Sequence, residues 1–210
     1  MPRHNPNKDI VQEIFRAVDD ENIDRLRLFL TTEDGNPNLR NDAGQTLLHY
    51  AASRSKYLSV MMLLEGGADP DLKGGMDKWT ALHYAAFHDN AKIIELLSQY
   101  SASPDVPDMH RQTPLHVAAE EGSPKAARAL IKMGADLSLK DNRERLAIDI
   151  ARTRENEVMD FQMQEFNDVA RDLRSAMEKQ KRQRAEKEKQ FKDDLKKLKG
   201  GDRDRYKLGG

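Results

Sequence analysis

A seven-residue segment occurs three times in this chain, and its spacing constrains the fold more than any other feature. Residues 46–52 read TLLHYAA, residues 80–86 read TALHYAA and residues 113–119 read TPLHVAA, so the copies begin 34 and 33 residues apart. A further step of 33 residues reaches Leu146, where LAIDIAR is a divergent fourth copy. A fixed period of this length is typical of stacked supersecondary units that bury their surface against one another.

The residue types in each copy favour the start of a helix. A threonine hydroxyl is a good N-cap because it accepts a hydrogen bond from a free backbone N–H group. A histidine follows each threonine by three residues, and it can bond back to the threonine or to the neighbouring loop. The alanine pair that closes each copy favours helix and allows close packing. The threonine–histidine pairs are Thr46 with His49, Thr80 with His83, and Thr113 with His116.

The motif and its period resemble the ankyrin-repeat family, whose members stack helix–turn–helix units joined by short hairpin loops. The resemblance implies an all-α repeat solenoid over residues 9–160, followed by a long C-terminal helix. The first and last units diverge from the motif, as terminal caps do. We expect disorder at residues 1–8 and 200–210. The expected units cover residues 9–41, 42–75, 76–108, 109–141 and 142–160.

Glycine usage differs between the units. Gly44 stands two residues before the threonine of unit two, but Lys78, Arg111 and Glu144 replace this glycine in the later units. If these positions require a positive φ, each replacement costs about 1 kcal/mol. The residues aligned at the turn between the two helices of a unit are Ser55, Asn90 and Gly122.

The residues after unit five predict a helix over 161–199, since neither glycine nor proline lies between Asn156 and Lys199. Its first part carries apolar residues at alternating spacings of four and three. This stripe either caps the solenoid core or forms the seam of a coiled-coil dimer. Residues 178–199 carry 15 charged side chains, net +5, which favours a solvated helix or a charged tail. The stripe consists of Met159, Met163, Phe166, Ala170, Leu173 and Met177.

Composition argues against several classes of function. The chain has no cysteine, which excludes a disulfide framework and a thiol nucleophile. It has no apolar run long enough to span a membrane and no secretory signal pattern at its start. No catalytic or phosphate-binding motif is found, so we expect no enzymatic activity, cofactor, metal or small-molecule substrate. We expect a cytoplasmic location, with the nucleus as the alternative.

Charge divides the chain into two parts. Residues 1–170 hold 28 acidic and 20 basic side chains, net −8, whereas residues 171–210 hold 8 acidic and 15 basic, net +7. An acidic body with a basic tail is not typical of a nucleic-acid-binding domain. We therefore expect another protein as the partner, rather than a nucleic acid or a membrane.

In the ankyrin family, partners usually contact the concave face formed by the hairpin loops and the first helices, and the resemblance implies the same here. The aromatic and methionine residues of units three and four are typical of interface cores. The arginines of unit five suit acidic partner groups or form a solvated face. For Trp79 and Phe87, the alternative is that they fill gaps left by the missing hairpin glycines. The matching residues are Met76, Trp79, Phe87, His88, Met109, His110, Gln112, Glu120, Arg143 and Arg145.

These features predict a non-enzymatic protein–protein interaction module that acts as an adaptor or scaffold. One alternative is a regulatory inhibitor or assembly chaperone whose acidic body masks a basic partner surface. Another is contact with an anionic surface, either nucleic acid or membrane, through the basic C-terminal helix. Self-association through the C-terminal helix is a further hypothesis.

Overall fold

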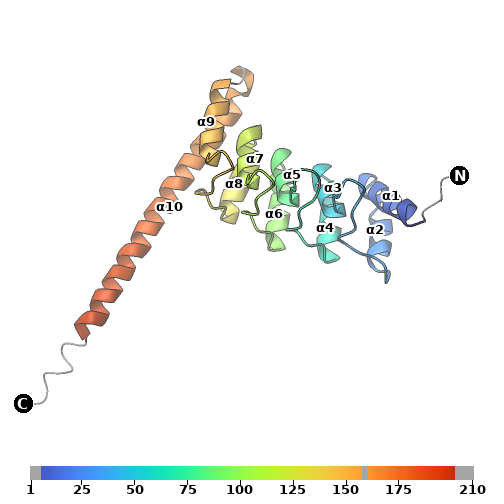
Figure 1. The fold of residues 1–210 in the computed structure, drawn as a ribbon, viewed down its shortest axis with the longest axis horizontal. Coiled ribbons are helices and arrows are strands. Elements are labelled where there is room, and N and C mark those ends of the chain that lie inside the picture. The colour runs from blue at the N-terminus through green and yellow to red at the C-terminus, as the bar shows by residue number, and fades with distance from the viewer. Residues whose placement is uncertain (1–5, 158–159, 202–210) are drawn as a thin grey trace, which may run out of the picture. The chain divides into compact units, whose positions relative to one another are not determined.

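The computed structural model describes the backbone of residues 6–157 and 160–201, and the side chains of residues 9–154 and 167–194. The described backbone forms ten helices and two isolated β-bridges, with no longer strand. An all-α repeat fold with a long C-terminal helix is thus confirmed (Figure 1). The helices are α1 (Pro6–Asp19), α2 (Ile23–Leu30), α3 (Leu47–Ser53), α4 (Tyr57–Glu65), α5 (Ala81–Phe87), α6 (Ala91–Gln99), α7 (Pro114–Glu121), α8 (Pro124–Met133), α9 (Ala147–Glu157) and α10 (Asp160–Gly201).

The chain separates into two compact parts, residues 1–173 and residues 174–210. In the first part, α1, α3, α5, α7 and α9 form an inner row in which each helix packs on the next. Helices α2, α4, α6 and α8 form the outer row in the same way. The core lies between the rows and repeats the same leucine positions. Its fully buried side chains include Leu48, Leu63, Leu82, Leu97, Leu115 and Leu130.

The predicted threonine–histidine caps are present in three units. The threonine N–H donates to the histidine Nδ1 over 3.0 Å in unit two, 3.1 Å in unit three and 3.2 Å in unit four. Nδ1 therefore accepts, so Nε2 carries the ring proton. Nε2 donates to a carbonyl in or just before the hairpin loop that precedes the next inner helix: Leu72 at 2.7 Å, Gln112 at 3.0 Å and Arg145 at 3.2 Å. Each histidine thus caps its own helix and joins two units.

The positions that lack the hairpin glycine do adopt a positive φ. The angle is 74° at Gly44, 58° at Lys78, 59° at Arg111 and 59° at Glu144. The left-handed conformation is thus kept in all four units, although only one has the residue that adopts it without strain.

The turn between the two helices of a unit requires one correction. The left-handed residue there is Ser55 in unit two, Asp89 in unit three and Gly122 in unit four. Asn90, which the sequence alignment placed at this position, is instead the N-cap of α6, and its side chain accepts from the Ile93 N–H at 3.2 Å. The expected turn position was wrong by one residue, because aspartate and asparagine both suit turns and N-caps and stand next to each other here.

The ends of the repeat region differ in detail from the expected boundaries. Helix α1 begins at Pro6, three residues before the expected start of unit one. Near the C-terminus, the side chains of Met159, Met163 and Phe166 lie outside the described residues. The stripe residues Ala170 and Leu173 are buried, as is Val169 beside them.

A salt bridge fixes residues 168–172 of α10 to the outer row. Arg128 of α8 contacts Asp172 at 2.6 Å and Asp168 at 3.6 Å. These acids lie on the same turn of helix as the buried Val169 and Leu173. Within the first compact part, residues 168–173 of the stripe therefore pack as an end cap for the repeats.

Candidate functional site

The hairpin loops before the inner helices are built on one repeated hydrogen-bond pattern. In unit four, the Asp108 N–H donates to the Gln112 carbonyl at 2.8 Å and closes the loop. The Asp108 side chain then accepts from the His110 N–H at 2.7 Å and the Gln112 N–H at 2.8 Å. Asn41 and Asp141 hold the loops of units two and five in the same way. These residues were not predicted from the sequence, although each stands five positions before the first residue of its seven-residue motif.

The loop of unit three is one residue longer, which explains the period of 34. It closes through the Gly74 N–H and the Trp79 carbonyl, 2.8 Å apart. Gly74 passes so close to His49 that an added Cβ would lie 2.6 Å from the imidazole Nδ1. Gly75 has a φ of 75°. Glycine is therefore required where this loop crosses the capping histidine of unit two.

Backbone hydrogen bonds join successive loops into one row. The Gly75 N–H donates to the Gly44 carbonyl at 3.4 Å, and the Met109 N–H donates to the Asp77 carbonyl at 3.0 Å. The Asn142 N–H donates to the His110 carbonyl at 2.9 Å. The side chains of neighbouring loops therefore stand in a fixed register.

The side chain two residues before each of α5, α7 and α9 is bonded to another group of the fold. The Trp79 Nε1 donates to an Asp108 carboxylate oxygen at 3.2 Å, and the Gln112 Nε2 donates to Glu120 at 2.9 Å. Arg145 contacts the buried carboxylate of Asp141 at 2.7 Å. Three of the expected contact residues, Trp79, Gln112 and Arg145, thus serve contacts between or within units.

Trp79 lies in an aromatic cluster that fills the space between loop and helix. Its ring centroid lies 6.0 Å from His83 in a stacked arrangement and 5.1 Å from Tyr84 in an edge contact. Phe87 lies 5.6 Å from it, and the Phe87 ring also meets His88 at 5.0 Å. Trp79 is half-buried, whereas Phe87 remains 40% exposed.

Several expected contact residues do point away from the core. Met76 is 89% exposed and Met109 is 56% exposed, and both stand at the same loop position in neighbouring units. His88 and His110 are exposed as well. We call this group, Met76, Phe87, His88, Met109 and His110, the loop surface. It combines Met76, Met109 and His110 of the bonded loops with Phe87 and His88 at the C-terminal end of α5.

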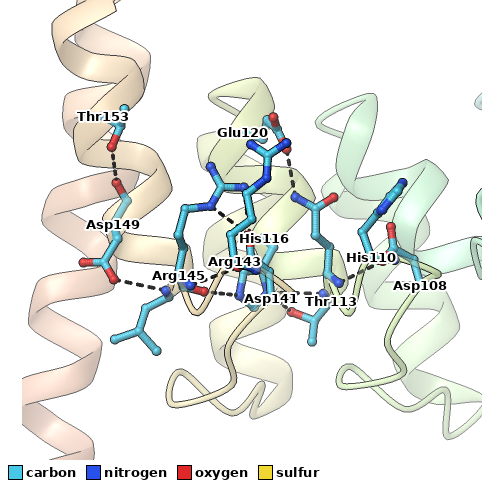
Figure 2. Close-up of polar contacts among 12 residues, drawn as sticks. Asp108, His110, Thr113, His116, Glu120, Asp141, Arg143, Arg145, Asp149 and Thr153 are labelled. Carbon is cyan, nitrogen blue, oxygen red and sulfur yellow. Dashed lines mark hydrogen bonds and ion pairs between the residues drawn. The ribbon is translucent and has the colours of Figure 1, made fainter.

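Unit five continues this row with charged groups (Figure 2). Arg143 is exposed, and its N–H is held by the Asp141 carboxylate at 2.8 Å. Glu120 accepts from Gln112 and meets Arg154 at 3.5 Å. Burial alone would raise the pKa of Asp141, but hydrogen bonds from Arg145 and the Arg143 N–H outweigh it and lower the pKa.

A groove that the sequence did not predict lies at the N-terminal end of the repeats. Its volume is about 510 Å³, and it runs between α1 and the loop of unit two. Val11, Phe15, Asp19, Ala43 and Tyr50 are among its lining residues. The Tyr50 hydroxyl donates to Asp19 at 2.5 Å, so one wall of the groove is already occupied by an internal bond.

Two chemical possibilities can be checked directly within the described residues. No group of three or more histidine, aspartate or glutamate side chains there is placed to hold a metal ion. In that same part of the chain, no helix is both long enough and apolar enough to cross a bilayer.

Known proteins match the repeat region. The fowlpox virus ankyrin repeat protein FPV014 is 32% identical over 125 residues, which cover 59% of this chain and 28% of that protein. The Drosophila melanogaster transient receptor potential channel pyrexia is 26% identical, with 55% of this chain and 15% of the channel covered. The Caenorhabditis elegans protein glp-1 is 35% identical, with 43% and 8% covered. The chain thus spans less than a third of the length of each relative.

The family comparison agrees with the fold. A model of ankyrin repeats in three copies matches residues 14–108 and 59–141, well over half of the chain. Ankyrin repeats indicate a protein–protein interaction module and are in general not enzymatic. With the capped helix pairs, the hairpin loops and this match in place, the chain belongs to the ankyrin-repeat family.

Proposed function

We propose that this chain is an adaptor or scaffold that binds a partner protein on the loop surface of units three and four. The observation that carries this proposal is the exposure of three large apolar side chains, two on the bonded row of loops and one at the end of α5. Met76 is 89%, Met109 56% and Phe87 40% exposed. Covering such groups removes apolar area from water, which favours association.

The loop surface is also pre-organised. The Met109 N–H is bonded to the Asp77 carbonyl of the preceding loop at 3.0 Å. The Phe87 ring is held between Trp79 and His88. A partner therefore meets groups whose backbone is already ordered, which lowers the entropic cost of binding.

The first experiment compares immobilised full-length protein with two variants, Phe87→Ala and Met109→Ala, in cell lysate. Leu58→Ala is the matched control, because Leu58 is a 47% exposed apolar residue on the outer helix α4. We expect a protein that the wild type and Leu58→Ala retain and that each loop-surface variant binds at least tenfold more weakly. If all four baits retain the same proteins equally, the loop surface is not the binding site.

A second candidate function is regulatory inhibition or assembly chaperoning of a basic partner. The acidic excess of residues 1–170, 28 acidic against 20 basic side chains, favours it. Such a complex should weaken steeply as salt rises, since the attraction between exposed charges is screened. Binding through the apolar loop surface should change little between 50 and 500 mM salt.

A third candidate function is contact with an anionic surface through α10. Nearly all described side chains between Glu178 and Asp194 are exposed. If this candidate is correct, deletion of residues 178–210 should abolish binding to anionic vesicles or nucleic acid and remove its salt dependence. Equal binding by residues 1–177 would exclude it.

A further inference from the structure

We infer that the partner segment runs extended along the row of hairpin loops and places a carboxylate on Arg143, about three residues beyond the side chain that contacts Met109. This inference rests on the proposed function. It adds the chemical class of a contact and the spacing of the groups in the partner.

Arg143 differs from the other arginines of unit five in its contacts. Arg145 is bonded to the buried Asp141, at 2.9 Å through Nε and 2.7 Å through Nη2. Arg154 meets Glu120 at 3.5 Å. Arg143 is exposed, its backbone is fixed by Asp141, and the described part of the chain offers its guanidinium no ion pair. Its guanidinium is therefore available to an oxyanion from outside.

The surrounding charges favour a carboxylate over a phosphate. Units four and five also carry Glu120, Glu121 and Glu144. Glu144 meets Lys140 at 3.2 Å and Arg111 at 4.0 Å, so those two cations are partly neutralised. Burial, and to a smaller extent the adjacent Glu120, raises the pKa of Glu121, whereas Arg154 opposes this shift. A single arginine in such surroundings suits a monoanion better than a dianion.

The connected loops set the spacing. Met76 and Met109 stand four residues before their threonines, and Arg143 stands three residues before Leu146. The Met109 and Asn142 N–H groups bond each loop to the one before. Packed helices lie roughly 10 Å apart, and a chain in the extended polyproline II conformation advances about 3.1 Å per residue and returns its side chains to the same face every three residues. One step along the loops therefore corresponds to about three residues of an extended partner.

The partner pattern that follows is an apolar residue, a second apolar residue three positions on, and an acidic residue three positions after that. The apolar residues would cover Met76 and Met109, beside Phe87, and the acidic residue would reach Arg143. Figure 2 shows Arg143 on the loop of unit five, beyond the loop of unit four that carries His110. The order of the three contacts follows the order of the units.

The test is a random-peptide display selection on the full-length protein and on Arg143→Glu. We expect the wild type to enrich peptides with the apolar–apolar–acidic spacing, and the variant to enrich lysine or arginine at the acidic position. A synthetic wild-type-selected peptide should bind Arg143→Glu at least tenfold more weakly. Its acid-to-lysine form should recover to within threefold on that variant. Arg27→Glu is the matched control, an exposed arginine of α2 in unit one, and should change affinity less than twofold.

The outcomes separate the inference from the function it rests on. Selected peptides that need Phe87 and Met109 but ignore Arg143→Glu would overturn the inference and leave the proposed function standing. Peptides insensitive to Phe87→Ala and Met109→Ala, or no enrichment at all, would overturn both. A phosphoserine at the acidic position that binds tenfold more tightly than glutamate would overturn the assignment to a carboxylate.

Discussion

At the scale of single residues, the buried histidines combine two roles. His49, His83 and His116 accept a hydrogen bond from the N–H of their own N-cap threonine and donate to a carbonyl in or just before the next hairpin loop. This arrangement requires a neutral imidazole, because a protonated ring has no acceptor. Burial lowers the pKa of His49 and His83 to about 4 and lowers that of His116. The stacking of the units is therefore linked to pH.

The expected pH dependence follows from this linkage. Because the folded pKa is below the unfolded value of about 6.5, the unfolded state binds more protons as pH falls from 6.5 towards 4. Stability is therefore full above pH 6.5 and is lost through that window, by roughly 2 kcal/mol at pH 5 for each of His49 and His83. Urea unfolding at pH 7.5 and 5 measures this loss. In His83→Gln the loss should be smaller by about 2 kcal/mol, and an unchanged loss would contradict the linkage.

The left-handed loop residues give a second residue-scale prediction. Lys78 and Gly44 hold equivalent positions with φ of 58° and 74°. Lys78→Gly relieves about 1 kcal/mol of backbone strain. Part of this gain is offset, because glycine loses more backbone entropy on folding than lysine does. We expect a gain of roughly 0.5 kcal/mol in the free energy of unfolding, measured in urea. Gly44→Ala should lose about 1 kcal/mol through φ alone, since an added Cβ there meets nothing closer than 4.0 Å. Changes of the same sign in the two variants would contradict this account.

At the scale of elements, the sequence predicted what depends on local chemistry. The caps, the helix pairs and the left-handed loop positions follow from Thr46, Gly44 and their equivalents, which act within a few residues of chain. The contact between Arg128 and Asp172 could not be predicted in this way, because it joins residues 44 apart. The hydrogen bond from Trp79 to Asp108, which links two loops, could not be predicted either, since Asp108 stands 29 residues away in the sequence.

The start of α10 gives a prediction at this scale. Leu173 is 1% exposed, so Leu173→Ala should leave a cavity and lower the free energy of unfolding by about 3 kcal/mol. Phe191→Ala on the same helix is the control, because Phe191 is 63% exposed and its loss should cost less than about 0.5 kcal/mol. Thermal and urea unfolding would show the difference. Equal effects would mean that residues 168–173 are not an end cap.

For the whole molecule, the sequence predicted where the loop positions lie, but not which of their side chains are bonded within the fold. The repeat period placed the exposed positions correctly for Met76, Met109 and Arg143, because the same loop recurs in each unit. The period could not distinguish these residues from Gln112 and Arg145, whose side chains are bonded to Glu120 and Asp141. The groove beside Phe15 was not predicted, since α1 belongs to a unit without the motif.

The division of the chain into two compact parts leads to the last prediction. None of the described side chains between residues 178 and 194 is buried. Ion pairs along the helix, such as Lys192 with Glu188, contribute only about 0.5 kcal/mol each to its stability. Residues 1–177 should therefore unfold within about 2 °C of the full chain, with less helical circular dichroism signal. Residues 1–167, which lack Val169 and Leu173, should unfold at least about 5 °C lower. If both truncations lowered the midpoint equally, the charged segment would contribute to the stability of the repeats, and the boundary at residue 173 would not separate independent parts.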